Sequence, residues 1–107
     1  MIVKIDGNQY RIGFQYGITH NHHHYEGIPL RYTQCDIFLL DAIGPWMKSG
    51  WAFCGPSDAF VKETGRKLAL QRALKKAGFT RDQRRQVWEQ YFQYTSSRPA
   101  SPVAVAS

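Results

Sequence analysis

Hydrophobic and polar positions alternate over the first sixteen residues of the chain. Two short runs, residues 2–5 and 9–16, flank an Asp6-Gly7 pair, which favours the positive φ angles of a type I′ turn. In the second run every other residue is large and apolar or aromatic, as a half-buried strand requires. These residues are Tyr10, Ile12, Phe14 and Tyr16. The pattern predicts a β-hairpin over residues 2–16.

Two further strands are predicted after a long loop. Residues 17–30 have no periodicity and contain two glycines and a proline, as loops do. Alternation returns over residues 31–40, and two extra apolar side chains indicate burial on both faces near the end of this third strand. After a break at Gly44-Pro45, the run 51–54 predicts a fourth strand that ends at Gly55-Pro56.

The hydrophobic period then changes from 2 to about 3.6, which indicates helices. Ser57 or Asp58 is predicted to cap a first helix, and Gly78 to end it, because glycine suits the left-handed position after a helix. Thr80 and Gln83 match a capping box, so a second helix begins at once. The apolar stripe of this second helix consists of Val87, Trp88, Tyr91 and Phe92.

The predicted order of elements is ββββαα, an α+β fold with a four-stranded antiparallel sheet followed by a two-helix hairpin. With 107 residues, 43% of them hydrophobic and 14% aromatic, the chain has the size and composition of one globular domain. We expect this domain to cover residues 1–94. Residues 95–107, rich in Ser, Pro and Ala, are expected to form a flexible C-terminal tail.

Small side chains recur at every fourth position of the first predicted helix. They are Gly65, Ala69, Ala73 and Ala77, and such a ridge lets another backbone approach closely. The ridge predicts either packing against the chain's own sheet or second helix, or a contact between subunits of a homo-oligomer. The second alternative arises because the helix has apolar groups on two opposite sides, and both must be buried.

Positive charge is concentrated in the two predicted helices. The chain has 14 Lys and Arg against 8 Asp and Glu, a net charge of +6, whereas residues 62–85 alone have nine basic and two acidic residues, a net charge of +7. A solvated helical face usually alternates acid and base, so the scarcity of acid favours an anionic partner, which arginine can hold with two parallel hydrogen bonds. The candidate ligand-binding residues are Lys62, Arg66, Arg72, Arg81, Arg84 and Arg85.

The three arginines of this set that begin the second helix are a separate signal. Positive charge on the first turn opposes the helix dipole by a few tenths of a kcal/mol per residue. A bound anion would offset this cost. We therefore expect the two helical segments to bring their cations together around a negative ligand.

Catalytic and metal-binding motifs are lacking in the sequence. It has no Gly-rich phosphate loop, Ser-centred elbow, HExxH or paired carboxylates, so we expect a protein that is not an enzyme and has no cofactor. Cys35 and Cys54 are predicted to be reduced thiols on strands that could place them side by side, with a Cys54 nucleophile as the alternative. The tract from His20 to His24 predicts a polar loop rather than a metal site, because consecutive histidines do not easily converge on one ion.

Secretion and membrane insertion are disfavoured by the sequence. No stretch approaches the roughly 18–20 apolar residues that cross a bilayer, and the first residues lack a basic segment followed by an apolar one. We therefore expect a cytoplasmic protein with no membrane partner.

Residues 54–74 contain the string Asp58-x-Phe60-x-Lys62-x-x-Gly65-Arg66, followed by Arg72-Ala73-Leu74. The string resembles the pattern D-x-F-x-K-x-x-G-R-x-x-A-L-x-R-A-L of small uncharacterised proteins of tailed phages and prophages. With Arg84, Trp88 and Tyr91, the resemblance covers about a third of the chain. It implies the cytoplasm of an infected bacterial host, but no function of the family carries over to this chain. A counter-defence role, such as sequestering a nucleotide signal of the host, is a hypothesis from that phage setting.

The sequence thus predicts a small basic accessory protein that binds an anionic ligand, a nucleotide or a nucleotide-derived signal. Two alternatives stay open. One is a nucleic-acid-binding protein, since a phosphate backbone attracts the same cations. The other is an inhibitor that docks its basic face on an acidic host protein.

Overall fold

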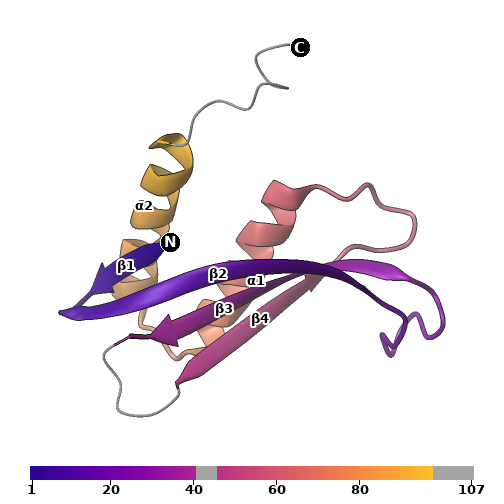
Figure 1. Ribbon diagram of the computed structural model, residues 1–107, viewed down its shortest axis with the longest axis horizontal. Coiled ribbons are helices and arrows are strands. Elements are labelled where there is room, and N and C mark those ends of the chain that lie inside the picture. The colour runs from indigo at the N-terminus through magenta and orange to yellow at the C-terminus, as the bar shows by residue number, and fades with distance from the viewer. Residues whose placement is uncertain (41–45, 98–107) are drawn as a thin grey trace.

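The computed structural model describes residues 1–40 and 46–97 of the chain. The elements are β1 (Ile2–Ile5), β2 (Asn8–Thr19), β3 (Leu30–Leu39), β4 (Met47–Phe53), α1 (Lys62–Lys76) and α2 (Arg81–Ser97). The strands form one antiparallel sheet in the order β1-β2-β3-β4, and both helices lie on the same side of it (Figure 1). The predicted ββββαα arrangement is confirmed.

Several predicted boundaries are corrected. Strand β2 continues beyond residue 16, because its pairing with β3 extends to Thr19 opposite Leu30. Strand β4 begins at Met47 rather than at Trp51, because its polar first half still pairs with β3 although it lacks an apolar pattern. Helix α2 reaches Ser97, three residues into the predicted tail. The rest of that tail and the Gly44-Pro45 break lie outside the described residues.

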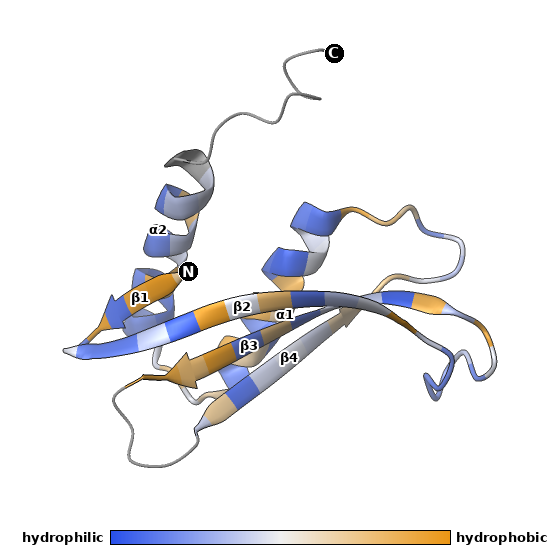
Figure 2. Ribbon diagram, in the orientation of Figure 1, coloured by the Kyte–Doolittle hydropathy of each residue, from blue (hydrophilic) through white to orange (hydrophobic). Residues whose placement is uncertain are grey.

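Alternation in the strands buries one face of the sheet beneath the helices. Figure 2 shows hydrophobic segments along β1, β2 and β3. The sheet contributes Val3, Ile5, Tyr10, Ile12, Cys35 and Ile37 to the core, and the helical part contributes Leu70, Leu74, Phe79, Val87 and Tyr91. Burying each large apolar side chain is worth about 1.5–3 kcal/mol relative to exposure, so both helices are held mainly by this shared core.

The ridge of small residues on α1 lies against the sheet of the same chain. Ala69 and Ala73 are fully buried. They cross β4 at Gly50, where a Cβ atom would come closer than 3.0 Å to backbone atoms of Ala69, Arg72 and Ala73. A Cβ atom at Gly65 would likewise come closer than 3.0 Å to the side chain of Thr33. The prediction of packing within the chain is confirmed, and the ridge gives no support to a subunit contact.

The N-terminus of α1 differs from the prediction. Val61, in an extended conformation, precedes the helix, and no side chain caps it, so the predicted cap by Ser57 or Asp58 is wrong. Asp58 instead closes a turn, in which its N–H donates to the carbonyl of Gly55 at 3.0 Å and its own carbonyl accepts from the Cys54 thiol at 3.4 Å. This turn holds Asp58 outside the helix.

The connection from α1 to α2 agrees with the sequence pattern. Gly78 has a φ of 74°, and its N–H donates to the carbonyl of Lys75 at 3.2 Å. The N–H of Phe79 donates to the carbonyl of Leu74 at 3.4 Å, which completes the Schellman pair of hydrogen bonds. The capping box follows immediately, because the N–H of Thr80 donates to Gln83 Oε1 at 2.9 Å and the N–H of Gln83 donates to Thr80 Oγ1 at 3.2 Å.

Loss of this capping box is expected to weaken the domain measurably. Thr80→Ala removes the acceptor for the Gln83 N–H and should lower the free energy of unfolding by about 1 kcal/mol. Urea denaturation followed by circular dichroism measures the change. Thr80→Ser keeps the hydroxyl and serves as the control, so equal stability of the Ala and Ser variants would contradict the role of the cap.

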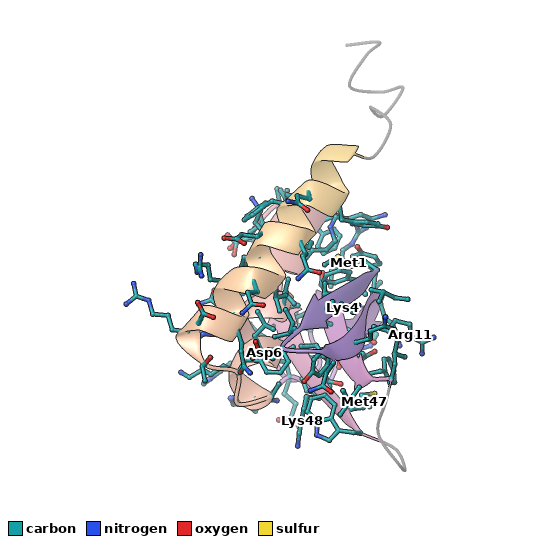
Figure 3. The ribbon with its side chains drawn as sticks, turned by 90° about the vertical axis from the view of Figure 1, so that its left-hand side faces the viewer. Met1, Lys4, Asp6, Arg11, Met47 and Lys48 are labelled. Carbon is teal, nitrogen blue, oxygen red and sulfur yellow. The ribbon has the colours of Figure 1, made fainter. Side chains whose placement is uncertain are left out.

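Both outer edges of the sheet receive hydrogen bonds from helical side chains. At β1, Gln90 of α2 accepts from the N–H of Lys4 and donates to its carbonyl, each at 3.0 Å. Figure 3 shows Lys4 on β1 beside this helix. At β4, Arg72 of α1 donates to the carbonyl of Trp51 at 2.6 Å. The two helices are thus tied to opposite edges of the sheet.

The helices are too short or too polar to cross a membrane. This finding concerns α1 and α2 within residues 1–40 and 46–97.

Candidate anion-binding groove

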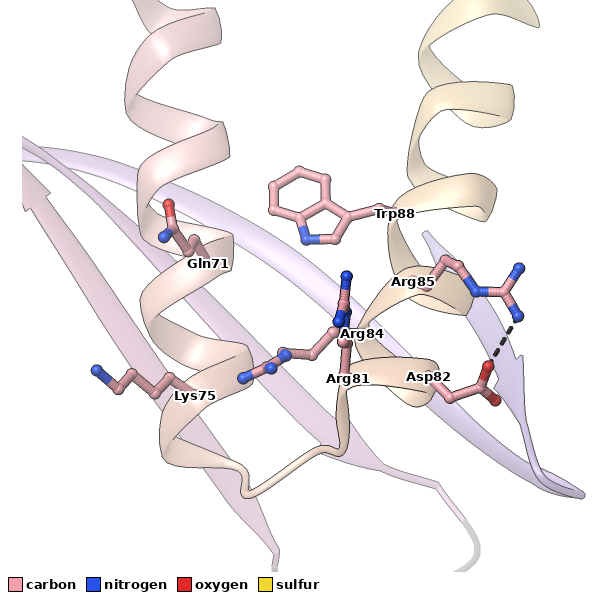
Figure 4. Close-up of a pocket in the computed structure, with 7 residues that line it drawn as sticks. All are labelled: Gln71, Lys75, Arg81, Asp82, Arg84, Arg85 and Trp88. Carbon is pink, nitrogen blue, oxygen red and sulfur yellow. Dashed lines mark hydrogen bonds and ion pairs between the residues drawn. The ribbon is translucent and has the colours of Figure 1, made fainter.

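A cavity of about 1140 Å³ opens between the C-terminal half of α1 and the first turns of α2 (Figure 4). We refer to it as the helix groove. It is lined by Gln71, Lys75, Arg81, Asp82, Arg84, Arg85 and Trp88. Three of these are among the six predicted ligand-binding residues, and all three come from the first turn of α2.

Among the described residues, three cations of the helix groove have no ion pair: Arg81, Arg84 and Lys75. In Figure 4, Arg84 reaches from α2 toward α1, and Arg81 points toward the ring of Trp88. Neither guanidinium has an ion pair or a side-chain hydrogen bond with another residue in the described part of the chain. Lys75 lines the α1 side of the same cavity and is likewise unpaired among the described residues. These three charges are available to an anion.

Arg85 is engaged in a different way. It pairs with Asp82 at 2.7 Å and with Glu89 at 3.3 Å, and in Figure 4 it points away from Trp88. Hydrogen bonds from Arg85 and Gln86 hold the pKa of Asp82 below its ordinary value. The acidic residue on the rim of the groove is therefore already neutralised by Arg85, and it does not compete with a ligand for Arg81 or Arg84.

The local sequence explains why these cations gather here. Gly78 ends α1, and the capping box starts α2 three residues later. Arg81 and Arg84 therefore fall within the first turn of α2, next to the last turn of α1. The positive end of the helix dipole lies at the same place, which adds to the attraction for an anion.

Trp88 forms an aromatic wall of the helix groove. Its ring lies edge-on to Tyr91 at a centroid distance of 5.6 Å and packs partly against the core. It also stacks on Phe92 at 5.7 Å, with 27° between the ring planes. The groove thus combines cationic side chains with an aromatic surface.

Lys62 and Arg66 lie in a separate cavity of about 370 Å³ near the N-terminus of α1. The ammonium of Lys62 lies 5.1 Å from the centroid of the Tyr16 ring. Arg66 donates to the hydroxyl of Tyr16 at 3.2 Å and to Glu63 at 2.6 Å. Arg66 is therefore largely occupied by contacts within the protein.

Arg72 occupies a third location, on the β4 side of α1. Its guanidinium bonds to the carbonyl of Trp51 and lines a cavity with Trp51, Phe53, Lys75 and Lys76. The six predicted residues therefore do not form one surface, and the expectation that they converge is corrected. The reason is that α1 is long enough to hold Lys62 at one end while only its other end approaches Arg81 and Arg84.

Sequence reasoning missed four residues of the helix groove, which are Gln71, Lys75, Asp82 and Trp88. Trp88 was assigned to the apolar stripe of α2, although its half-buried ring also lines the groove. Gln71 and Lys75 were not among the candidate residues, although they are four positions apart and so share one face of α1. That spacing was the available signal, but the placement of this face next to the first turn of α2 is visible only in the structure.

The cysteines are not side by side. Cys35 on β3 pairs with Gly50, whereas the N–H of Cys54 donates to the carbonyl of Arg31. This register places the two residues four positions apart along neighbouring strands, or about 13 Å. Burial, together with the adjacent Asp36, raises the pKa of Cys35 to about 12. Its thiol therefore stays protonated at neutral pH and is a poor nucleophile.

The histidine tract forms part of the turn between β2 and β3. His22 stacks on His23 at 4.8 Å and meets the ring of Phe53 at the same distance. Among residues 1–40 and 46–97, no three His, Cys, Asp or Glu side chains are arranged to hold a metal ion. The tract contributes ring contacts to the end of the sheet.

The fold and the site together define an α+β protein with a cationic, aromatic-walled groove between two helices on one side of its sheet. In comparisons with protein-family models, curated proteins and solved structures, none matched this chain.

Proposed function

We propose that this protein is a non-enzymatic binding protein whose helix groove holds a phosphate-bearing ligand with an aromatic base, that is, a nucleotide unit. One observation carries the proposal. Arg81 and Arg84, which have no ion pair among the described residues, line the groove together with the ring of Trp88.

The chemistry of the groove matches both parts of such a ligand. A guanidinium can hold a phosphate through two parallel charge-assisted hydrogen bonds, and Lys75 adds a third positive charge at the rim. The ring of Trp88 offers a stacking surface, and stacking of a base on an aromatic side chain is worth about 1–3 kcal/mol. The amide of Gln71 can donate or accept hydrogen bonds within the same cavity.

An acidic host protein is the less favoured occupant. Its carboxylates would satisfy Arg81 and Arg84, yet they would not stack on the part of the Trp88 ring that lines the groove. The relationship to phage proteins and a counter-defence role stay predictions. In that setting, the proposed activity is the sequestering of a nucleotide or a nucleic acid.

Reversing the charge of the two unpaired arginines tests the proposal. The double variant Arg81→Glu/Arg84→Glu should bind ATP at least about 100-fold more weakly than the unmodified protein, since hydrogen bonds to charged groups contribute about 1.5–3 kcal/mol each. Isothermal titration calorimetry with ATP, ribose 5-phosphate and inorganic phosphate measures the affinities. ATP should bind most tightly, because only ATP also supplies a base.

The matched control is Lys4→Glu/Lys48→Glu, which changes the net charge equally at two exposed positions outside the groove. It should retain most of the affinity for ATP. Equal weakening of both double variants would show that only the total charge of the protein matters. Failure of all three phosphate compounds to bind the unmodified protein would contradict the proposed function.

A further inference from the structure

The aromatic wall of the helix groove continues one turn beyond Trp88. Phe92 follows four residues later on α2, is 46% exposed, and stacks on Trp88 with 27° between the planes. The ammonium of Lys67, on α1, lies 5.6 Å from the centroid of the Phe92 ring. The two rings therefore form a step beside α1, in which Phe92 is about half exposed and contacts Lys67.

The opposing wall on α1 is polar along the same length. Lys67, Gln71 and Lys75 are spaced by four residues, so they form one row on the helix. Gln71 and Lys75 line the groove. Lys67, the third member of the row, contacts Phe92 and therefore also faces α2. Cations thus stand at both ends of the aromatic step, with Arg81 and Arg84 at one end and Lys67 at the other.

Lys67 is only partly neutralised within the protein. Its ammonium lies 3.6 Å from a carboxylate oxygen of Glu63, which also pairs with Arg66 at 2.6 Å. One carboxylate therefore serves two cations, and a net positive charge remains at this end of the step. A chain of phosphates passing over the rings would meet positive charge at each end.

We infer that the occupant of the helix groove is a single strand of nucleic acid, with successive bases on Trp88 and Phe92. This inference rests on the proposed function and extends it from one nucleotide unit to at least two. Residues four apart on a helix are separated by about 6 Å along its axis. That exceeds the roughly 3.4 Å per nucleotide of a duplex strand and suits an extended strand with separated bases. Duplex bases are paired and stacked on one another, so their faces are closed to these rings.

A series of oligothymidylates tests the inference. Fluorescence anisotropy competition should show affinity rising about tenfold or more from thymidine monophosphate to the dinucleotide and tetranucleotide. The affinity rises because a second base can stack on the second ring, and because more phosphates reach the cations. A duplex of the same length should compete less well than the single strand. Affinity for the strand should fall as salt concentration rises, more steeply than affinity for the mononucleotide.

Variants at Phe92 separate ring stacking from general charge attraction. Phe92→Leu should weaken binding of the tetranucleotide about 5- to 100-fold without changing affinity for the mononucleotide, and Phe92→Tyr should restore it. Tyr25→Ala, which removes an exposed ring from the turn between β2 and β3, is the control and should leave both affinities unchanged. Thermal unfolding checks that the Phe92 variants remain folded.

Three results would overturn the inference. Equal affinity for mononucleotide and tetranucleotide, with Arg81 and Arg84 still required for both, would be compatible with the proposed function. It would exclude a single strand of nucleic acid as the occupant of the groove. Equal binding of tetranucleotide by Phe92→Leu and Phe92→Tyr would exclude stacking on that ring. Competition by polyglutamate as strong as that of the tetranucleotide would indicate a site for any polyanion, including an acidic protein.

Discussion

Replacing Phe79 by alanine is expected to lower the free energy of unfolding by about 3–5 kcal/mol, the usual cost of removing a buried phenyl ring. Phe79 is 9% exposed, and its ring packs edge-on against Tyr10 of β2 at 5.1 Å. Tyr10 in turn contacts Trp46 at 6.0 Å. A domain of this size typically has only about 5–15 kcal/mol of stability in total, so the substitution removes a large share of it.

The same substitution should also weaken the binding of ATP in the helix groove. Phe79 lies between the end of α1 and the capping box of α2, so its anchorage to β2 fixes where Arg81 and Arg84 stand relative to Lys75. Urea denaturation measures the stability, and ATP titration at low temperature, under folded conditions, measures the binding. Phe92→Ala removes an equal ring that is half-exposed, and it should cost far less stability. A loss below about 1 kcal/mol for Phe79→Ala would contradict this anchoring role.

Alanine at Gly50 should be strongly destabilising although the change adds a single methyl group. In an ordinary strand, alanine is about 0.5–1 kcal/mol more favourable than glycine. Here the new Cβ would press on backbone atoms of Ala69, Arg72 and Ala73, which cannot move aside as a flexible side chain could. We expect a loss of about 3 kcal/mol or more, because α1 must lift from β4 and open the core.

Gly13→Ala is the matched control for this prediction. Gly13 lies in β2, and a Cβ built there has no neighbour within 4 Å, so the change should be neutral or slightly stabilising. Thermal and urea unfolding of both variants measure the difference. Similar stabilities would show that α1 does not approach the sheet as closely as described.

Short-range signals made much of the fold predictable. The Asp6-Gly7 turn, the glycine ending of α1 and the capping box depend on hydrogen bonds among residues a few positions apart. Such contacts are encoded in the local sequence. The predicted cap of α1 is wrong because Asp58 forms a turn with Gly55 instead. The residue pattern allows both the turn and the helix cap, and it does not indicate which of the two is more stable.

The candidate site was less predictable because it depends on how the two helices are placed on the sheet. A helical wheel orders residues around one axis, but it cannot tell which part of α1 faces α2. Arg66 donates a hydrogen bond to Tyr16, and Arg72 donates one to the carbonyl of Trp51. Both partners lie on strands that are distant in sequence. Trp88 was read as a core residue, since a ring that both packs and lines a groove has the same pattern as one that only packs.

The hydrogen bonds of Gln90 to Lys4 and of Arg72 to Trp51 bear on how the protein behaves when crowded. The outer strands of an open sheet present unpaired backbone groups that invite strands of other molecules to add on. Gln90 satisfies one such pair on β1, and Arg72 satisfies one such carbonyl on β4. The helices that form the groove thereby also protect the sheet from fibre-like growth, so variants that loosen either helix are expected to expose backbone groups at the edges of the sheet and to aggregate more readily.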